Sequence, residues 1–179
     1  VFRNIPLHIS DKSHLGVRGE AILSYDTFDR INQSLEVDAQ YKNPRNLCSG
    51  SVRQLDSRVT KERGVDFLAY YALFSDETSR QQNGFSDSKQ KQWQYLEDLG
   101  FTVVEFHRVN SSILRVCMDD FTKRSKDFVY PVDGLVLCYD SLSYAESLGS
   151  TAKFPRHSLA YKWQDETAQK IIRDIEWSP

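Results

Sequence analysis

Several charged side chains of this 179-residue sequence have types and spacings suited to binding an anion. Arg45 and Arg53 lie eight residues apart, with the small residues 49–51 (Ser-Gly-Ser) between them. Lys162 stands between two aromatic residues. Arginine side chains bind phosphate oxygens bidentately, and lysine contributes a compact point charge. Together these cations predict a site for a ligand that carries phosphate.

Two carboxylates lie beside apolar residues. Glu20 is part of the run 17–23 (VRGEAIL), and Asp133 precedes Gly134 and an apolar Leu-Val-Leu. Taken singly, each charged residue also fits an ordinary role. Glu20 suits a solvated position on an alternating strand, Asp133 a turn, and Lys162 the edge of a sheet. The two arginines suit a solvated helix face, so the residues by themselves leave both interpretations open.

Composition and cysteine usage argue against several classes of protein. Hydrophobic residues make up 40% of the chain, which is enough for a core, and the net charge of −2 means that contact with nucleic acid requires a local basic patch. The three cysteines and four histidines are scattered, which disfavours disulfides and zinc sites and favours a reducing cytoplasm. No apolar run reaches about 18 residues, so no membrane span is expected. Because the chain begins at Val1, we expect it to be a piece of a longer protein.

Hydrophobic periodicity predicts a mixture of α and β elements that must position these residues. Strands are predicted over residues 17–23, 65–74, 101–106, 132–140 and 159–163, the second of them buried on both faces. Helices are predicted over 25–36 with Ser24 as N-cap, over 93–99 with an end at Gly100, and over 113–121. The polar residues 75–88 are predicted to form an exposed loop.

Four sequence blocks occur in an order and at a spacing that are specific to one family. They are Val17–Glu20 (VRGE), Asn43–Asn46 (NPRN) with Gly50–Asp56 (GSVRQLD), Asp133–Val136 (DGLV), and Leu148–Arg156 (LGSTAKFPR) continuing to Ala160–Lys162 (AYK). With these blocks the chain resembles the nucleotidyltransferase (adenylation) domain of bacterial NAD-dependent DNA ligases, from about residue 2 to residue 168. The resemblance implies an α+β nucleotidyltransferase fold of antiparallel sheets flanked by helices, with the nucleotide cleft between them. It also implies that residues 1–179 are a partial adenylation domain, incomplete at the N-terminus.

The activity implied by the resemblance is the sealing of nicks in duplex DNA. In this family AMP passes from NAD to a lysine and then to a DNA 5′-phosphate, and the 3′-hydroxyl then displaces it. The implied cofactors are NAD and Mg²⁺, and the implied partners are nicked double-stranded DNA and NAD or AMP. Downstream OB-fold, zinc, helix-hairpin-helix and BRCT domains are expected in the parent chain, which would be cytoplasmic.

The resemblance also implies roles for individual residues. It puts Glu20 on the ribose hydroxyls of the adenylate and Lys162 on the α-phosphate, and it puts Asp133 near the metal ion and the reacting phosphate. It makes Arg156 a neighbour of the nucleotide pocket. Finally, it makes Arg45 and Arg53 contacts to DNA phosphates, with Arg58, Lys61 and Arg63 extending the basic stretch.

Two departures from the family pattern affect these expectations. The family's nucleophile is the lysine of a Lys-x-Asp-Gly motif, but the only Asp-Gly here, Asp133-Gly134, follows Pro131-Val132, so this sequence lacks the nucleophile. The strand after Gly134 usually carries a lysine where this chain has Cys138, and Lys153 is a candidate for the missing charge. Two readings compete: a fragment of a ligase, inactive alone, and a non-catalytic nucleotidyltransferase-like module that binds nucleic acid or a protein partner.

Overall fold

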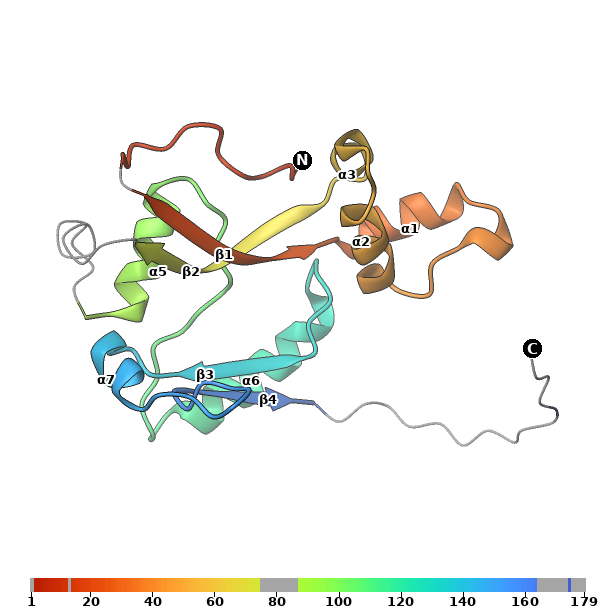
Figure 1. The fold of residues 1–179 in the computed structure, drawn as a ribbon. Helices are drawn as coiled ribbons and strands as arrows, with labels where there is room; N and C mark the ends of the chain where they lie inside the picture. The colour runs from red at the N-terminus through yellow and green to blue at the C-terminus, as the bar shows by residue number, and fades with distance from the viewer. Residues whose placement is uncertain (1, 13, 75–86, 164–173, 175–179) are drawn as a thin grey trace.

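Two small antiparallel sheets form the frame of the part of the chain that the computed structural model describes, residues 2–12, 14–74, 87–163 and 174. Strand β1 (Leu15–Ile22) pairs with β2 (Asp66–Phe74), and β3 (Gly134–Cys138) pairs with β4 (Ser158–Lys162). Figure 1 shows the β1/β2 sheet above the β3/β4 sheet, with helices at the flanks and ends of both. This arrangement agrees with the predicted α+β class of antiparallel sheets flanked by helices.

Five of the six α-helices in the described residues begin after a residue whose side chain caps them, and α6 begins after Ile113 without such a cap. Ser24, Asn43, Asp56, Ser88 and Ser141 each accept a hydrogen bond from a backbone N–H of the first turn that follows. The helices are α1 (Tyr25–Gln33), α2 (Pro44–Val52), α3 (Ser57–Glu62), α5 (Lys89–Asp98), α6 (Leu114–Arg124) and α7 (Leu142–Ser147), with 3₁₀ turns η1 (Val37–Ala39) and η2 (Ser125–Asp127).

A bulge in β2 lies opposite Gly19 of β1. The register of β1 against β2 shifts between Arg18 and Gly19. A Cβ atom at Gly19 would lie 2.3 Å from the ring of Phe67 and 2.5 Å from the carbonyl oxygen of Leu68, so this position has no room for any other residue. The extra residue of the bulge is Tyr70 of β2, which has no Cα partner on β1.

The core lies on one side of the β1/β2 sheet and at its end. Helix α5 packs against β2 through Leu96. Leu96 and Ala69 are fully buried, and Ala72 is nearly so. A second buried cluster joins the end of β1 to α1, α2 and the start of β2; it consists of Leu23, Ile31, Leu47, Cys48 and Val65. The opposite face of the sheet is open, and Glu20 and Tyr70 are exposed on it.

A buried carboxylate ties three distant segments together. Asp66, at the start of β2, is 2% exposed. Its carboxylate accepts bonds from Arg3 Nε (3.0 Å) and Nη2 (2.6 Å) and from the Tyr130 hydroxyl (2.9 Å). The N-terminal segment and the segment leading into β3 are thereby held at one end of β2.

Most of the predicted elements are confirmed, with shifted ends. Helix α1 begins after the Ser24 cap as predicted but ends at Gln33 and not at residue 36. Helix α5 ends before Gly100, whose φ of +89° suits the residue after a helix. Helix α6 and the strands β1, β2, β3 and β4 all lie where the sequence predicts them.

Three expectations are wrong or incomplete. Residues 101–106 form no strand, because Val103 makes a single parallel bridge to Ala69. Strand β2 is not buried on both faces, since Tyr70 and Leu73 are 42% and 37% exposed. Helices α2, α3 and α7 were not predicted. Most of the predicted loop, residues 75–86, lies outside the described residues.

None of the helices in the described ranges is long and apolar enough to cross a membrane.

Replacing Asp66 by alanine would leave Arg3 and Tyr130 without their shared acceptor. We expect the free energy of unfolding to fall by about 2–3 kcal/mol, less than for a fully buried pair, because Arg3 is 61% exposed and its charge is screened. Urea denaturation followed by circular dichroism measures this. The control is Asp119→Ala, which breaks an exposed pair with Arg115 and should change the midpoint little. Equal midpoints for the two variants would contradict the role given to Asp66.

Candidate functional site

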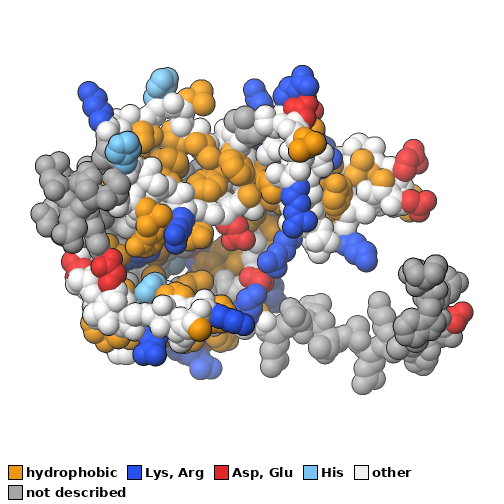
Figure 2. All heavy atoms as spheres, in the orientation of Figure 1, with side chains coloured by type: hydrophobic (Ala, Val, Ile, Leu, Met, Phe, Trp, Pro, Cys, Tyr) orange, Lys and Arg blue, Asp and Glu red, His pale blue; other side chains and the backbone are white. Residues whose placement is uncertain are grey.

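A large cleft separates the open faces of the two sheets. Its volume is about 2370 Å³, and residues of all four strands line it, together with α2 and the start of α5. Figure 2 shows the hollow between the upper and lower layers, with basic and acidic side chains gathered at the end near α2. Because both walls are made by strands, side chains at alternate positions point into the same space.

An ion pair lies at one end of this cleft, on the second sheet. Lys162 Nζ lies 2.9 Å from Asp133 Oδ2, and both side chains are exposed. The two residues meet because Gly134 pairs with Lys162 across β3 and β4. A Cβ at Gly134 would lie 2.3 Å from the carbonyl oxygen of Tyr161, so the close pairing requires glycine.

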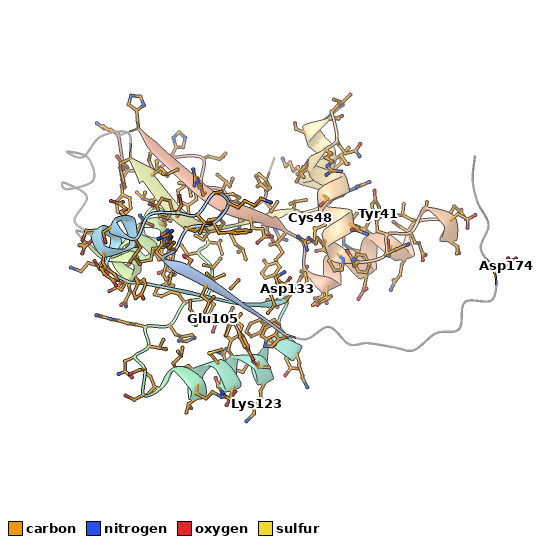
Figure 3. All side chains as sticks on the ribbon, turned by 60° about the horizontal axis from the view of Figure 1, so that its bottom comes forward. Tyr41, Cys48, Glu105, Lys123, Asp133 and Asp174 are labelled. Carbon is orange, nitrogen blue, oxygen red and sulfur yellow. The ribbon has the colours of Figure 1, made fainter. Side chains whose placement is uncertain are left out.

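Arg45 brings helix α2 into the same site. The hydrogen bond from Lys162 lowers the pKa of Asp133, and the charge of Arg45 lowers it further. Figure 3 shows Asp133 on the side of the second sheet that faces the helix carrying Cys48. A carboxylate and two cations from different layers therefore share one end of the cleft.

Glu20 lies on the opposite wall. It lines the cleft and is close enough to act on the thiol of Cys48, whose pKa is raised to about 11 by burial and, to a lesser extent, by the Glu20 charge. Regular alternation along β1 puts Glu20 on the open face of the sheet, the face that also carries Arg18. The structure thus brings together Glu20, Arg45, Asp133 and Lys162 around one space.

The other two predicted site residues lie outside the cleft lining. Arg53 is the C-cap residue of α2, and its side chain is exposed. Arg156 is also exposed, and its backbone N–H donates to the carbonyl of Gly149. Neither residue lines the cleft that holds the other four.

The small residues between the two arginines pack inside the protein. Ser51 is fully buried, donates its hydroxyl to the carbonyl of Leu47 and accepts a bond from Arg63 Nη1 at 3.1 Å. A Cβ at Gly50 would lie 3.1 Å from the ring of Tyr41, which also has the Arg63 guanidinium over its face. The Ser-Gly-Ser gap therefore admits Tyr41 and helix α3.

Two members of the basic stretch already have internal partners. Arg63 is bound to Ser51 and Tyr41 as described, and Arg58 is paired with Asp56 at 2.7 Å. Arg45 and Arg53 have no ion pair among the described residues, and both are exposed.

Cys138 is exposed at the far end of β3. Burial raises the pKa of its thiol, and the nearby charge of Lys89 opposes that shift. The cation that acts on this position therefore comes from α5, although Lys153 also lines the cleft. Sequence reasoning missed Lys89, yet one signal was available: a lysine in the first turn of a helix is opposed by the helix dipole.

The described residues contain no cluster of three or more histidine, cysteine, aspartate or glutamate side chains that could hold a metal ion. Asp133 therefore belongs to no such cluster within this part of the chain. Mg²⁺ is commonly bound through one or two carboxylates together with substrate phosphates and waters, and a lone Asp133 fits that mode.

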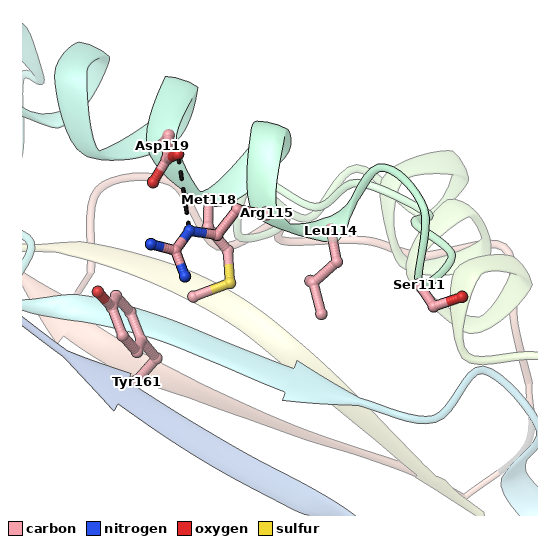
Figure 4. Close-up of a pocket in the computed structure, with 6 residues that line it drawn as sticks. All are labelled: Ser111, Leu114, Arg115, Met118, Asp119 and Tyr161. Carbon is pink, nitrogen blue, oxygen red and sulfur yellow. Dashed lines mark ion pairs between the residues drawn. The ribbon is translucent and has the colours of Figure 1, made fainter.

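A smaller pocket of about 310 Å³ lies between α6 and β4. Figure 4 shows Arg115 and Asp119 of α6, paired at 3.8 Å, above Tyr161 of β4. None of the predicted site residues lines this pocket.

Comparison with known proteins identifies the family to which most of the chain is similar. Residues 1–166 match the family described as the NAD-dependent DNA ligase adenylation domain. The chain is 44% identical over 180 residues to a DNA ligase of Ruminiclostridium cellulolyticum, covering 100% of this chain and 27% of that protein. It is 42% identical over 179 residues to a DNA ligase of Lachnoclostridium phytofermentans (99% and 27%) and 36% identical over 177 residues to one of Clostridioides difficile (97% and 25%).

The chain thus spans about a quarter of the length of the curated relatives it matches. The family match, in contrast, covers nearly all of the chain and includes each of the four residues that meet in the cleft. On these grounds the chain belongs to the family of NAD-dependent DNA ligase adenylation domains.

Proposed function

We propose that residues 1–179 are part of the adenylation domain of an NAD-dependent DNA ligase and that the cleft between the sheets binds the adenylate. The observation that carries this proposal is the meeting of Asp133, Lys162 and Arg45 at one end of the cleft, with Glu20 on the opposite wall. A pure binding module has no need for a carboxylate and two cations converging on one point. Phosphoryl transfer needs that combination, because its catalysis rests on positioning and charge neutralisation.

Lys162 and Asp133 would act on the reacting phosphate. An exposed ion pair contributes little free energy, so an arriving α-phosphate can replace Asp133 as the partner of Lys162. The ammonium then offsets negative charge that develops on the phosphoryl oxygens, while the freed carboxylate faces the same point. When bound there, Mg²⁺ supplies Lewis-acid polarisation of the phosphate, with Asp133 as its protein ligand.

Glu20 would orient the sugar. A carboxylate accepts hydrogen bonds from two neighbouring hydroxyls, and Glu20 stands across the cleft from the phosphate end. The ribose of a nucleotide held by Lys162 would lie between the two walls. Arg156, outside the cleft lining, would approach this pocket only from its rim.

Arg45 and Arg53 would contact the phosphates of the DNA backbone, which fixes the position of the duplex without reading its sequence. Arg45 reaches the cleft, whereas Arg53 is exposed at the end of α2, so the two would mark a path from the surface to the reacting phosphate. The substrate would be nicked double-stranded DNA, with NAD as the AMP donor.

The nucleophilic lysine would come from elsewhere in a longer polypeptide, because no Lys-x-Asp-Gly motif occurs in this sequence. We expect that polypeptide to carry OB-fold, zinc, helix-hairpin-helix and BRCT domains and to work in the cytoplasm, where its DNA substrate would be.

A second candidate function is a non-catalytic nucleotidyltransferase-like module that binds nucleic acid or a protein partner. Cys138 favours it, because a thiol occupies a place in the cleft where the resemblance leads us to expect lysine. The parent reading frame separates the two candidates, since the enzyme requires an upstream Lys-x-Asp-Gly.

The chain alone should form no covalent lysyl-AMP, because it lacks the nucleophile. Incubation with radiolabelled NAD and Mg²⁺, followed by gel separation, should leave no acid-stable label on it, whereas the complete polypeptide should be labelled. Stoichiometric labelling of the chain alone would mean that another lysine serves.

Lys162→Ala in the complete ligase should reduce nick sealing by roughly a hundred- to a thousandfold, the usual effect of removing a well-placed electrostatic contact in a transition state. The fold, followed by circular dichroism, should persist, because the side chain is exposed. Lys123→Ala is the matched control, an exposed lysine on α6 outside the cleft lining. Near-normal sealing by the Lys162 variant would instead make it an ordinary surface residue.

Arg53→Ala should weaken binding to nicked duplexes of unrelated sequence about equally. It should also flatten the slope of log K against log salt by roughly one unit per lost phosphate contact. Lys123→Ala is the control, since this exposed lysine lies on α6, away from the α2–α3 stretch and outside the cleft lining. A thermal melt of each variant comes first; a folded Arg53 variant with an unchanged salt slope would remove this arginine from the DNA site.

A further inference from the structure

Lys89 is a cation in the cleft that forms no ion pair with a carboxylate of the described residues. Its Nζ donates to the carbonyl of Tyr70 at 3.0 Å and to Gln92 Oε1 at 2.9 Å. Among the described residues no carboxylate forms an ion pair with it, and the titrating group that acts on it is the Cys138 thiol. A half-buried ammonium whose neighbours are neutral retains the capacity to donate to a ligand.

Aromatic side chains surround this ammonium. It lies 3.9 Å from the ring centroid of Tyr71 and 5.3 Å from that of Trp93, which in turn packs on Phe106 with ring centroids 4.7 Å apart. All of these residues line the cleft. Burial lowers the pKa of Lys89 to about 8, in agreement with a desolvated setting. The immediate surroundings of the Lys89 ammonium are thus aromatic, and two further charged residues at this end, Arg108 and Asp140, are paired with each other at 3.8 Å.

The backbone fixes where Lys89 lies relative to the phosphate end. Its N–H donates to the carbonyl of Asp140 at 2.7 Å, and the N–H of Gln90 donates to the Asp140 carboxylate at 3.0 Å. The first turn of α5 is therefore held against the chain just beyond β3. Asp133 directly precedes the other end of that strand. Four steps from Gly134 to Cys138, at about 3.3 Å each, separate the two ends by about 13 Å.

We propose that Lys89 and the aromatic residues around it form the base-binding end of the cleft, in which the Lys89 ammonium donates a hydrogen bond to a ring nitrogen of adenine. This inference rests on the proposed function and deepens it by naming the residue that reads the base. A nucleotide whose phosphate lies at Lys162 and whose ribose lies near Glu20 extends its base along β3 toward Lys89.

The chemistry of the two ends supports this assignment. Phosphate binding calls for several cations, and the end at Asp133 has Lys162 and Arg45. A purine calls for aromatic and apolar surface with a few fixed polar groups, and that description fits the end at Lys89. A charged donor to a ring nitrogen distinguishes bases by where their acceptors lie.

The test compares adenosine with its 1-deaza, 3-deaza and 7-deaza analogues, each of which lacks one ring-nitrogen acceptor. The complete ligase is first freed of bound AMP with excess nicotinamide mononucleotide, and binding is then measured by calorimetry. One analogue should bind the wild type roughly tenfold more weakly than adenosine, as expected for a lost bond to a charged donor. In Lys89→Leu and Lys89→Met, that analogue and adenosine should bind equally, because neither side chain has a hydrogen-bond donor.

The control is Lys91→Gln, an exposed lysine on the same helix outside the cleft lining, which should preserve the full discrimination. Thermal melts confirm that each variant is folded. If both Lys89 variants unfold, the wild-type series still decides, because equal binding of all the analogues would mean that no ring nitrogen is read and would overturn the inference.

Two further results would overturn it. Undiminished discrimination in a folded Lys89 variant means that another group reads the base. If a folded Lys89 variant binds AMP more weakly than the wild type but binds adenosine equally well, Lys89 contacts a phosphate and not the base. Failure of the proposed function looks different: the complete polypeptide would take up no AMP from NAD at all.

Discussion

The Asp66 carboxylate is the contact on which the layout of the cleft depends. It is buried at the start of β2 and is held by Arg3 from the N-terminal segment and by Tyr130 from the segment that enters β3. A buried carboxylate is tolerated only where donors surround it, so these segments must converge on this point. Because Asp133 and Gly134 follow Tyr130 by only a few residues, the contact also determines where the second sheet begins.

The end of the cleft at Asp133 and Lys162 depends on the close approach of paired strands within each sheet. Gly19 and Gly134 each lie where a Cβ would collide with backbone of the neighbouring strand, so β1 can pair this closely with β2, and β3 with β4, only because these two residues are glycine. The proposed site residues Glu20, Asp133 and Lys162 lie directly beside or opposite these glycines. The close pairing of Gly134 with Lys162 brings the Asp133 carboxylate to the Lys162 ammonium. Because this ion pair is exposed, separating the two side chains requires little free energy.

How much of this follows from sequence differs from element to element. Strands and capped helices were predictable because alternation and capping residues are local signals, as with Ser24 and Gly100. The prediction of a strand over 101–106 was wrong because the apolar residues of this segment pack beside β2 without forming a ladder of hydrogen bonds. Val103 makes only a single bridge to Ala69. Helix α2 was missed because Ser-Gly-Ser has low helix propensity and the helix depends on the Asn43 cap and on packing against Tyr41. The motif residues of the site were found by resemblance, whereas the pairing of Lys162 with Asp133 needs the register of β3 and β4.

The end of the cleft away from Asp66 is held by surface contacts that sequence could not reveal. Asp140 accepts bonds at the start of α5, and Asp87 accepts bonds from the start of α7, so each helix N-terminus is capped by a carboxylate that precedes the other helix. This exchange joins α5 of the first layer to the chain after β3 of the second. It also explains how a lysine can occupy the first turn of α5: the Asp140 carboxylate offsets the dipole that opposes it. The same contact that closes this end of the cleft therefore places Lys89 beside Cys138.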